Sequence, residues 1–221
     1  MMMKQSFLLW MGTVLTLIIG MCSCSSDDEM GSKYDALFDV SYFDQDPNQN
    51  ERQGYWLGEE FIELTPQNEP PFILMVKWDS DIGKNALDYI VGKNDGVVQN
   101  RYNYQEDNTA LIVCNKYISC PYFFVSSSYK SPKAHLLENE YCRVDNSIVL
   151  KMKEGMDVEA IEHRYADVLM RYVGDRQLKG MEIFDCNLKT SCELLQLAEE
   201  ISQRDDVEWA EPNMFFPVHV Y

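Results

Sequence analysis

Basic residues are scarce in this sequence. The 221 residues include 19 Lys and Arg against 36 Asp and Glu, which gives a formal net charge of −17 at pH 7. Nucleic-acid binding depends on clustered Lys and Arg side chains that displace the counterions of the phosphate backbone, and the chain has no such cluster. The charge balance therefore excludes DNA and RNA as expected partners.

Glycine and proline are also infrequent, with 11 Gly and 8 Pro in the whole chain. Low-complexity chains have many more of both, and disordered chains have fewer aromatic residues than the 12% found here. Hydrophobic residues make up 46% of the sequence, which is enough apolar material for one or two packed domains. We therefore expect most of the chain to fold.

No apolar stretch is long enough to be a stable membrane span. Lys4 precedes apolar residues at 7–10 and 14–19, the order of the basic and apolar regions of a signal peptide. The segment Cys22-Ser23-Cys24 that follows resembles the lipobox of bacterial lipoproteins. We predict a lipoprotein signal peptide at residues 1–23 and acylation of Cys24. Cys22 is the alternative acyl acceptor, and an ordinary secretory signal is the alternative to lipidation.

An acidic run, Asp27-Asp28-Glu29, comes soon after Cys24. It resembles the export signal that some Gram-negative gut bacteria use to place lipoproteins on the outer surface, although a solvated linker would also be acidic. We predict an outer membrane lipoprotein displayed at the cell surface. Because the chain is acidic, anionic lipid headgroups would not attract it, and we expect the attached lipid to hold it at the membrane. Residues 24–52 are interpreted as an acidic tether with one short ordered segment at 34–43.

Five cysteines remain after Cys24, and none has the CxxC spacing or the nearby histidine of a metal site. An odd number outside the cytoplasm leaves at least one thiol free. We interpret them as buried structural thiols, with a Cys114–Cys120 or Cys186–Cys192 disulfide as the alternative. No metal and no cofactor is predicted. The five are Cys114, Cys120, Cys142, Cys186 and Cys192.

Residues 53–145 are predicted to form an N-terminal α+β subdomain. A hairpin at 54–64 would turn near Gly58, and the apolar run 72–78 predicts a buried strand. A helix should begin near Asp81 and stop at Gly92. Its expected apolar face consists of Ile82, Ala86, Leu87, Ile90 and Val91. Further strands are expected at 97–104, 109–114 and 122–125.

Residues 146–221 show a clearer α+β order, β-α-β-α-β. Strands are expected at 147–153, 178–184 and 207–210, the last ending before Pro212. Asp157 would cap one helix, and the capping box from Thr190 to Glu193 opens the other. The first helix would have an apolar face of Val158, Ile161, Tyr165, Val168, Leu169 and Tyr172; the second, one of Leu194, Leu197, Ala198 and Ile201.

One further strand, close to the second expected strand at 178–184, would complete a ferredoxin-like split β-α-β sandwich. The strand-then-helix order at Phe72 recurs at Ile148, which allows the two subdomains to be related.

Two segments of the second half carry a family resemblance. Residues 148–155, Ile-Val-Leu-Lys-Met-Lys-Glu-Gly, and residues 205–213, Asp-Asp-Val-Glu-Trp-Ala-Glu-Pro-Asn, resemble the opening and closing strands of the propeptide domain of subtilisin-like serine proteases, especially the fervidolysin-type prodomains. The resemblance covers about a third of the chain. It implies a domain that packs on the protease through its sheet, assists its folding and lays its C-terminal tail along the active-site cleft.

The resemblance gives the last residues a role in binding. The tail would be an extended peptide in the cleft, with Tyr221 in the first pocket, Val218 in the fourth and Pro217 limiting backbone freedom. It also implies that Glu208 and Glu211 meet helix N-termini of the protease. The alternative is a strand that closes the domain's own sheet. The predicted tail is Pro217, Val218, His219, Val220 and Tyr221.

The sequence has no residues for subtilisin catalysis, and it stops at Tyr221 with no protease domain behind it. None of His135, His163 and His219 lies in a His-Gly-Thr setting, and there is no Gly-Thr-Ser-Met turn. We therefore predict that the chain is not an enzyme. It would be a lipid-anchored, propeptide-like protein that inhibits or chaperones a subtilisin-like serine protease in trans.

Two other interpretations remain open. An adhesion or glycan-binding surface lipoprotein could use the same fold without protease binding, with aromatic side chains that stack on sugars. Those candidates are Tyr55, Trp56, Trp78, Tyr102 and Tyr104. An enzyme of unknown type could use Glu59 and Glu60 as general acid and base, although adjacent charges on a surface loop do not require that role.

Overall fold

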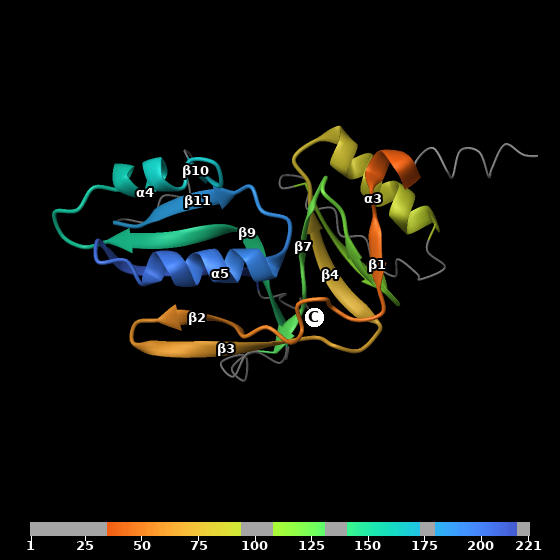
Figure 1. Cartoon of the computed structure of the whole chain (residues 1–221), viewed down its shortest axis with the longest axis horizontal. Helices are drawn as coiled ribbons and strands as arrows, with labels where there is room; N and C mark the ends of the chain where they lie inside the picture. The colour runs from red at the N-terminus through yellow and green to blue at the C-terminus, as the bar shows by residue number, and fades with distance from the viewer. Residues whose placement is uncertain (1–34, 94–107, 131–140, 173–179, 216–221) are drawn as a thin grey trace, which may run out of the picture. The chain divides into compact units, whose positions relative to one another are not determined.

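A computed structural model describes residues 35–93, 108–130, 141–172 and 180–215 (Figure 1). The chain divides into two compact units, Met1–Leu37 and Phe38–Tyr221, and the fold below is that of the second. The predicted signal peptide, the acylation of Cys24, the strand at 97–104 and the tail from Pro217 lie outside the described residues. Within the described ranges, no helix has the length and apolar character needed to cross a bilayer.

The described elements confirm the α+β class, and the named strands pair in antiparallel fashion. In chain order they are β1 (Ser41–Phe43), β2 (Gln53–Leu57), β3 (Glu60–Pro66), β4 (Phe72–Lys77), α3 (Asp81–Lys93), β5 (Thr109–Cys114), β6 (Tyr117–Ser119), β7 (Phe124–Ser126), β8 (Tyr129–Lys130), β9 (Tyr141–Met152), α4 (Glu159–Arg164), β10 (Leu169–Arg171), β11 (Glu182–Cys186), α5 (Ser191–Ser202) and β12 (Val207–Phe215).

Strand β9 is the centre of the C-terminal sheet. It pairs with β11 on one side and β12 on the other, and β10 pairs with β11, so the strand order is β12-β9-β11-β10. Helix α4 lies between β9 and β10 in the sequence, and α5 lies between β11 and β12. Strand β9 also runs across the boundary predicted between residues 145 and 146, so the two predicted subdomains share a strand.

The first helix of this half is shorter than predicted. Helix α4 ends at Arg164, and Leu169 instead pairs with Cys186 in the short strand β10. The apolar pair Val168-Leu169 fits either structure, and the neighbouring strand β11 decides between them because it buries Leu169. Asp157 is not the N-cap that the sequence predicted, because the N-cap is Val158 and no side chain caps the helix. Asp157 lies one residue earlier, and its Oδ1 accepts a hydrogen bond from the backbone N–H of Glu159 at 3.0 Å.

The last strand is longer than predicted, because β12 continues through Pro212 to Phe215. Proline is tolerated there because, among the described strands, β12 pairs with β9 alone and is therefore at the edge of this sheet. The register with β9 shifts twice, between Val207 and Trp209 and between Pro212 and Met214. At the first shift the extra residue, Glu208, lies on β12. At the second shift the extra residues lie on β9, where residues 145–147 occupy the stretch that Asn213 alone occupies on β12.

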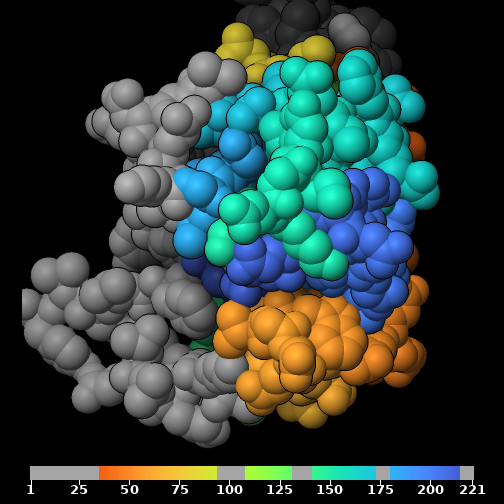
Figure 2. All heavy atoms as spheres, turned by 90° about the vertical axis from the view of Figure 1, so that its left-hand side faces the viewer, coloured from red at the N-terminus to blue at the C-terminus, as the bar shows by residue number. Residues whose placement is uncertain are grey.

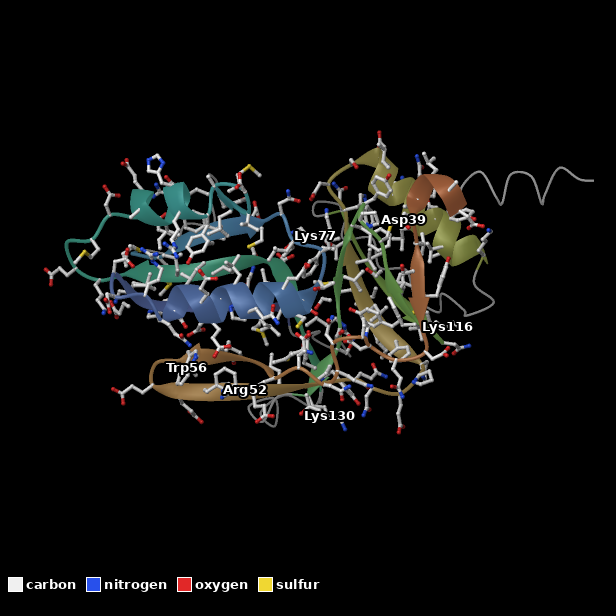
Figure 3. The ribbon with its side chains drawn as sticks, viewed as in Figure 1. Asp39, Arg52, Trp56, Lys77, Lys116 and Lys130 are labelled. Atoms are coloured by element: carbon white, nitrogen blue, oxygen red, sulfur yellow. The ribbon has the colours of Figure 1, made fainter. Side chains whose placement is uncertain are left out.

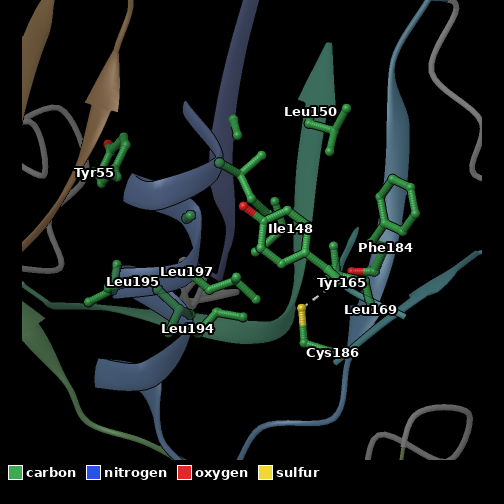
Figure 4. Close-up of a cluster of buried hydrophobic side chains, with 14 of the residues drawn as sticks. Tyr55, Ile148, Leu150, Tyr165, Leu169, Phe184, Cys186, Leu194, Leu195 and Leu197 are labelled. Atoms are coloured by element: carbon green, nitrogen blue, oxygen red, sulfur yellow. Dashed lines mark hydrogen bonds between the residues drawn. The ribbon is translucent and has the colours of Figure 1, made fainter. Parts of the chain in front are cut away.

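The helices α4 and α5 cover one face of the C-terminal sheet. Ile148 and Leu150 of β9 and Phe184 of β11 are fully buried beneath them (Figure 4). Ile161 of α4 and Ala198 of α5 are fully buried in the same cluster. These residues belong to one apolar cluster that also contains Leu194, Leu197 and Ile201, the face predicted for the second helix. The apolar residues of α5 recur with the helical period of 3.6, and those of the strands beneath recur at every second residue, so both apolar faces point into the same core.

The opposite side of α5 packs against the β2–β3 hairpin. The hairpin turns at Gly58-Glu59, as predicted, and Gly58 has a φ of +61°, a conformation that glycine adopts without strain. Its buried residues Tyr55, Ile62 and Leu64 join the same apolar cluster. Figure 2 shows the hairpin, in orange, directly against the blue C-terminal segment. Short strand β8 connects the hairpin strand β3 to β9.

A second apolar cluster lies under helix α3. Strands β5, β4 and β7 form a three-stranded sheet, and Ala86, Leu87 and Ile90 of α3 pack on it as predicted. Ile82 is an exception, because it lies on the exposed side of the helix and is 52% exposed. Gly92 does not stop the helix, which includes it and runs to Lys93. Phe38 is buried in this cluster, so the chain is already packed before β1.

Replacement of Thr190 with alanine should lower the free energy of unfolding by about 1 kcal/mol, the usual contribution of an N-cap side chain. Thr190 Oγ1 accepts a hydrogen bond from the Glu193 N–H at 3.3 Å, and Glu193 Oε2 accepts one from the Thr190 N–H at 3.0 Å. Urea denaturation would measure the change. Thr190→Ser keeps the oxygen and should retain most of the stability; an equal loss in both variants would contradict the capping explanation.

Candidate functional site

The face of the C-terminal sheet away from the helices is half-buried and carries mixed side chains. Val149 pairs directly with Ile183 of β11 and with Glu211 of β12, so these three lie side by side on this face. The same alternation places further residues there, and we call the set the outer sheet face. Its members are Ser147, Val149, Lys151, Met170, Ile183, Asp185, Trp209 and Glu211.

The two predicted protease-contacting acids lie close together on β12 but in different settings. Glu208 is the extra residue of the first bulge, and its Oε1 lies 2.9 Å from Lys151 Nζ. Both side chains are exposed by about two-fifths or more, so this ion pair contributes little stability. Glu211 lies on the outer sheet face, where its charge contributes to a raised pKa of Tyr55 that burial mainly causes. Both acids therefore lie on the strand that leads toward the tail.

A cavity of about 690 Å³ lies at one end of the outer sheet face. Its floor includes Asp145, Asn146 and Ser147 of β9, and Ile183 and Asp185 of β11. The other walls come from the end of β4 and the residues after it, where Figure 3 labels Lys77, and from the segment that enters β10. These elements are distant in the sequence, so only the tertiary structure assembles the cavity.

The floor of the cavity is polar at the second register shift, where β9 contributes the extra polar residues Asp145, Asn146 and Ser147. Asn213 of β12 donates a hydrogen bond from its Nδ2 to Ser147 Oγ at 3.0 Å. Asp145 accepts hydrogen bonds from the Asn146 N–H at 2.8 Å and from Lys77 Nζ at 2.9 Å. Bulges commonly reorient side chains next to binding sites. The sequence analysis missed this site, although the polar run Asp145-Asn146-Ser147 inside an apolar strand was a visible signal.

Of the aromatic residues considered for sugar stacking, the three that the structure describes do not share one cluster or cavity. Tyr55 and Trp78 are 8% and 6% exposed and belong to different apolar clusters. Trp56 lines a smaller cavity of about 370 Å³ together with Trp209, Glu59 and Glu208. Tyr102 and Tyr104 lie outside the described residues. Sugar stacking by these residues stays a prediction. Glu60, an exposed hairpin residue, is not among the residues that line the smaller cavity with Glu59.

The five cysteines are all buried and none is in a disulfide, which confirms the interpretation as structural thiols. Burial raises the pKa of Cys114 and Cys142 to about 11 and that of Cys186 and Cys192 to about 12. Cys120 is also shifted upward by burial. Thiols with such pKa values are protonated at neutral pH and are poor nucleophiles. Among the described His, Cys, Asp and Glu side chains, no three converge in a metal-binding arrangement.

A buried polar cluster joins elements of the two apolar clusters. Asp46 is 2% exposed; its Oδ2 accepts a hydrogen bond from Ser127 Oγ, and its Oδ1 accepts one from the Asn48 N–H at 2.9 Å. The Ser127 N–H in turn donates to Ser191 Oγ, in the first turn of α5, at 3.2 Å. Ser191 Oγ also shares a hydrogen bond with the Tyr129 hydroxyl. Because these groups satisfy one another away from the cavities, the cluster has a structural role.

Comparison with protein-family models, with curated proteins and with solved structures finds no match to this chain. The functional argument therefore depends on the geometry and chemistry of the chain itself.

Proposed function

We propose that residues 146–221 form a ferredoxin-like split β-α-β domain that binds a subtilisin-like serine protease and either inhibits it or assists its folding. The observation that carries the proposal is the strand order β12-β9-β11-β10 with both helices on one face. The short strand β10, which pairs with β11, supports the proposed domain because such a sandwich would have an additional strand beside β11. The two segments that resemble the propeptide family are adjacent strands, β9 and β12.

The outer sheet face would be the surface that contacts the protease. It combines half-buried apolar side chains, Val149 and Ile183, with the charges of Lys151 and Glu211. An interface of this kind has an apolar centre and a polar rim. The edge strand β12 ends at Phe215, so the tail from Pro217 would continue from the edge of the same surface. An extended tail can add to strands beside the cleft of a protease.

The anchor belongs to the same proposal. Acylation of Cys24 would hold the domain at the outer membrane, and the acidic residues after it would favour surface display. A lipid-anchored binder of this type would act on a protease at the same membrane surface. The net charge of −17 makes attraction to anionic headgroups an unsuitable alternative to a lipid.

Titration of the soluble chain from Ser25 to Tyr221 against a panel of subtilisin-like proteases tests the proposal. We expect stoichiometric inhibition of at least one protease, or a higher yield of active enzyme when the chain is present during protease refolding. Deletion of residues 217–221 should abolish inhibition and leave the circular dichroism spectrum unchanged. Rapid cleavage of the chain, or no effect on activity or refolding across the panel, would contradict the proposed function.

A matched pair of variants tests the outer sheet face. Ile183→Glu places a charge at its centre and should weaken inhibition at least about tenfold, which corresponds to 1.4 kcal/mol. Ile82→Glu makes the same change on the exposed side of α3 and should have no effect. Thermal unfolding would verify that both variants fold. Equal inhibition by both folded variants would remove this face from the proposed interface.

A further inference from the structure

The smaller cavity, of about 370 Å³, lies where strand β2 of the hairpin approaches the first residues of strand β12. Trp56 of β2 and Trp209 of β12 line it. On each strand the neighbouring residue is buried in the core, Tyr55 with 8% and Ala210 with 0% of its surface exposed. Successive side chains of a strand point to opposite faces, so both indole rings lie on faces turned away from the core.

The two indole rings offer apolar surface to the cavity. Trp56 and Trp209 are both half-buried, whereas Trp78 is 6% exposed and packs in the core. Nε1 of Trp56 has almost no accessible surface, so the exposed part of this indole is carbon. Tryptophan is enriched where proteins bind partners, because covering its large ring removes much apolar surface from water. Two such side chains at one cavity therefore indicate a binding site.

The hairpin holds the Trp56 ring in a fixed position. Trp56 lies directly across from Phe61 on β3, and the two rings pack edge to face with their centroids 5.3 Å apart. The guanidinium carbon of Arg52 lies 3.7 Å from the centroid of the Phe61 ring, and Figure 3 labels Arg52 and Trp56 beside the hairpin. A ring that is already held in place loses little conformational entropy when a ligand packs on it.

Polar side chains surround the two indole rings. Gln203, Glu59 and Glu208 line the cavity and are exposed. Within the described part of the chain, the side chains of Gln203 and Glu59 make no hydrogen bond or ion pair, and Glu208 is paired with Lys151 at 2.9 Å. The Gln203 amide can both donate and accept, and the Glu59 carboxylate accepts. The carboxylates would repel a phosphate or another anion.

We propose that this cavity binds a sugar residue of a neutral glycan. One face of a pyranose ring consists largely of C–H groups, which can pack on the carbon surface of an indole. Its hydroxyl groups both donate and accept hydrogen bonds, so they complement the Gln203 amide and the Glu59 carboxylate. The volume lies near the lower end of the range of about 300–1,000 Å³ that is typical of ligand pockets, which suits the end of a glycan chain.

The inference does not depend on the proposed function, because the two indole rings line the cavity whatever the outer sheet face binds. Trp209 is the one member of the outer sheet face that also lines this cavity, and Ile183 at the centre of that face does not. Ile183→Glu should therefore leave sugar binding unchanged while it weakens protease inhibition. The failure of either proposal can thus be recognised without the other.

Nuclear magnetic resonance of the ¹⁵N-labelled chain from Ser25 to Tyr221 tests the proposal. The probes are four neutral oligosaccharides: cellotriose, maltotriose, mannotriose and N-acetyllactosamine. We expect saturable shifts of the indole N–H signals of Trp56 and Trp209 with at least one of them. The signal of Trp78, which does not line the cavity, is the internal control and should stay unchanged. Absence of saturable shifts with all four sugars would overturn the proposal.

Matched variants locate the binding in the cavity. Trp209→Ala should weaken sugar binding at least about tenfold, and Gln203→Ala should weaken it several-fold. Met170→Ala truncates another exposed apolar side chain of the outer sheet face, outside this cavity, and should leave binding unchanged. Thermal unfolding would verify that all three variants fold. Equal binding by the three folded variants would contradict the site.

A quaternary ammonium ion is another kind of ligand that packs on indole rings beside carboxylates. Choline chloride, titrated in the same way, separates the two ligands. Raised salt should leave the affinity for a neutral sugar unchanged, because screening acts on charges. Tighter binding of choline than of every sugar, or loss of sugar binding in raised salt, would overturn the assignment to a neutral glycan.

Discussion

Gly83→Ala is expected to lower the free energy of unfolding by more than about 2 kcal/mol, a loss typical of steric conflict in a packed core. Gly83 is buried in the first turn of α3. A Cβ atom there would lie 2.8 Å from Trp78 Cβ and closer still to the Tyr122 carbonyl oxygen. Neither neighbour is the end of a flexible side chain, so the helix itself would have to move away.

Gly92→Ala is the matched control in the same helix. Nothing lies within 4 Å of the added Cβ, and the lower entropy of the unfolded chain should raise the free energy of unfolding by up to about 1 kcal/mol. Urea denaturation of both variants would measure the difference. A neutral Gly83→Ala variant would show that α3 does not approach the segment at Tyr122 as closely as described.

Asp46→Asn should have a higher stability relative to the unchanged protein at pH 7.5 than at pH 4. Burial raises the pKa of Asp46, and the nearby charge of Glu51 adds to this effect, although hydrogen bonds from Ser127 and Asn48 oppose it. The ionised carboxylate is therefore less favourable in the folded state than in the unfolded chain. Asparagine keeps an acceptor for the Asn48 N–H and carries no charge to bury.

The pH dependence follows from the direction of this shift. Because the pKa of Asp46 is higher in the folded state, the folded state holds the proton over a pH range in which the unfolded state has lost it. Stability from this group is fully present below the unfolded pKa, near 3.8, and is lost as the pH rises through the folded pKa. The advantage of Asp46→Asn should therefore shrink as the pH falls toward 3.8.

Asp44→Asn is the control, since Asp44 lies two residues earlier with a side chain that is 88% exposed. Its stability relative to the unchanged protein should vary little with pH. Thermal unfolding at several values between pH 4 and pH 8 would give both comparisons. A larger gain from Asp46→Asn at pH 4 than at pH 7.5 would contradict the direction of the shift.

Patterns in the sequence correctly predicted those helices and strands whose structure is decided by residues close by in the chain. The β2–β3 hairpin, strands β4 and β5, and helix α5 with its capping box all form where the residues indicated. In each case the turn residue, cap or hydrophobic period acts within a few positions, so no distant partner is needed to choose the structure. The helix predicted through Tyr172 failed because its apolar residues fit a helix and a strand equally well.

The sequence by itself determined the acidic character of this protein, its α+β class and the alternation of apolar residues in its C-terminal half. Tertiary structure decided which strands are neighbours, where β10 replaces a helix, and that Asp79, Asn146 and Asp185 line one cavity. Composition and the spacing of apolar residues can be read from the order of residues along the chain. Strand pairing and cavity formation depend on contacts between residues far apart in the sequence, and only the folded backbone and its bulges bring those residues together.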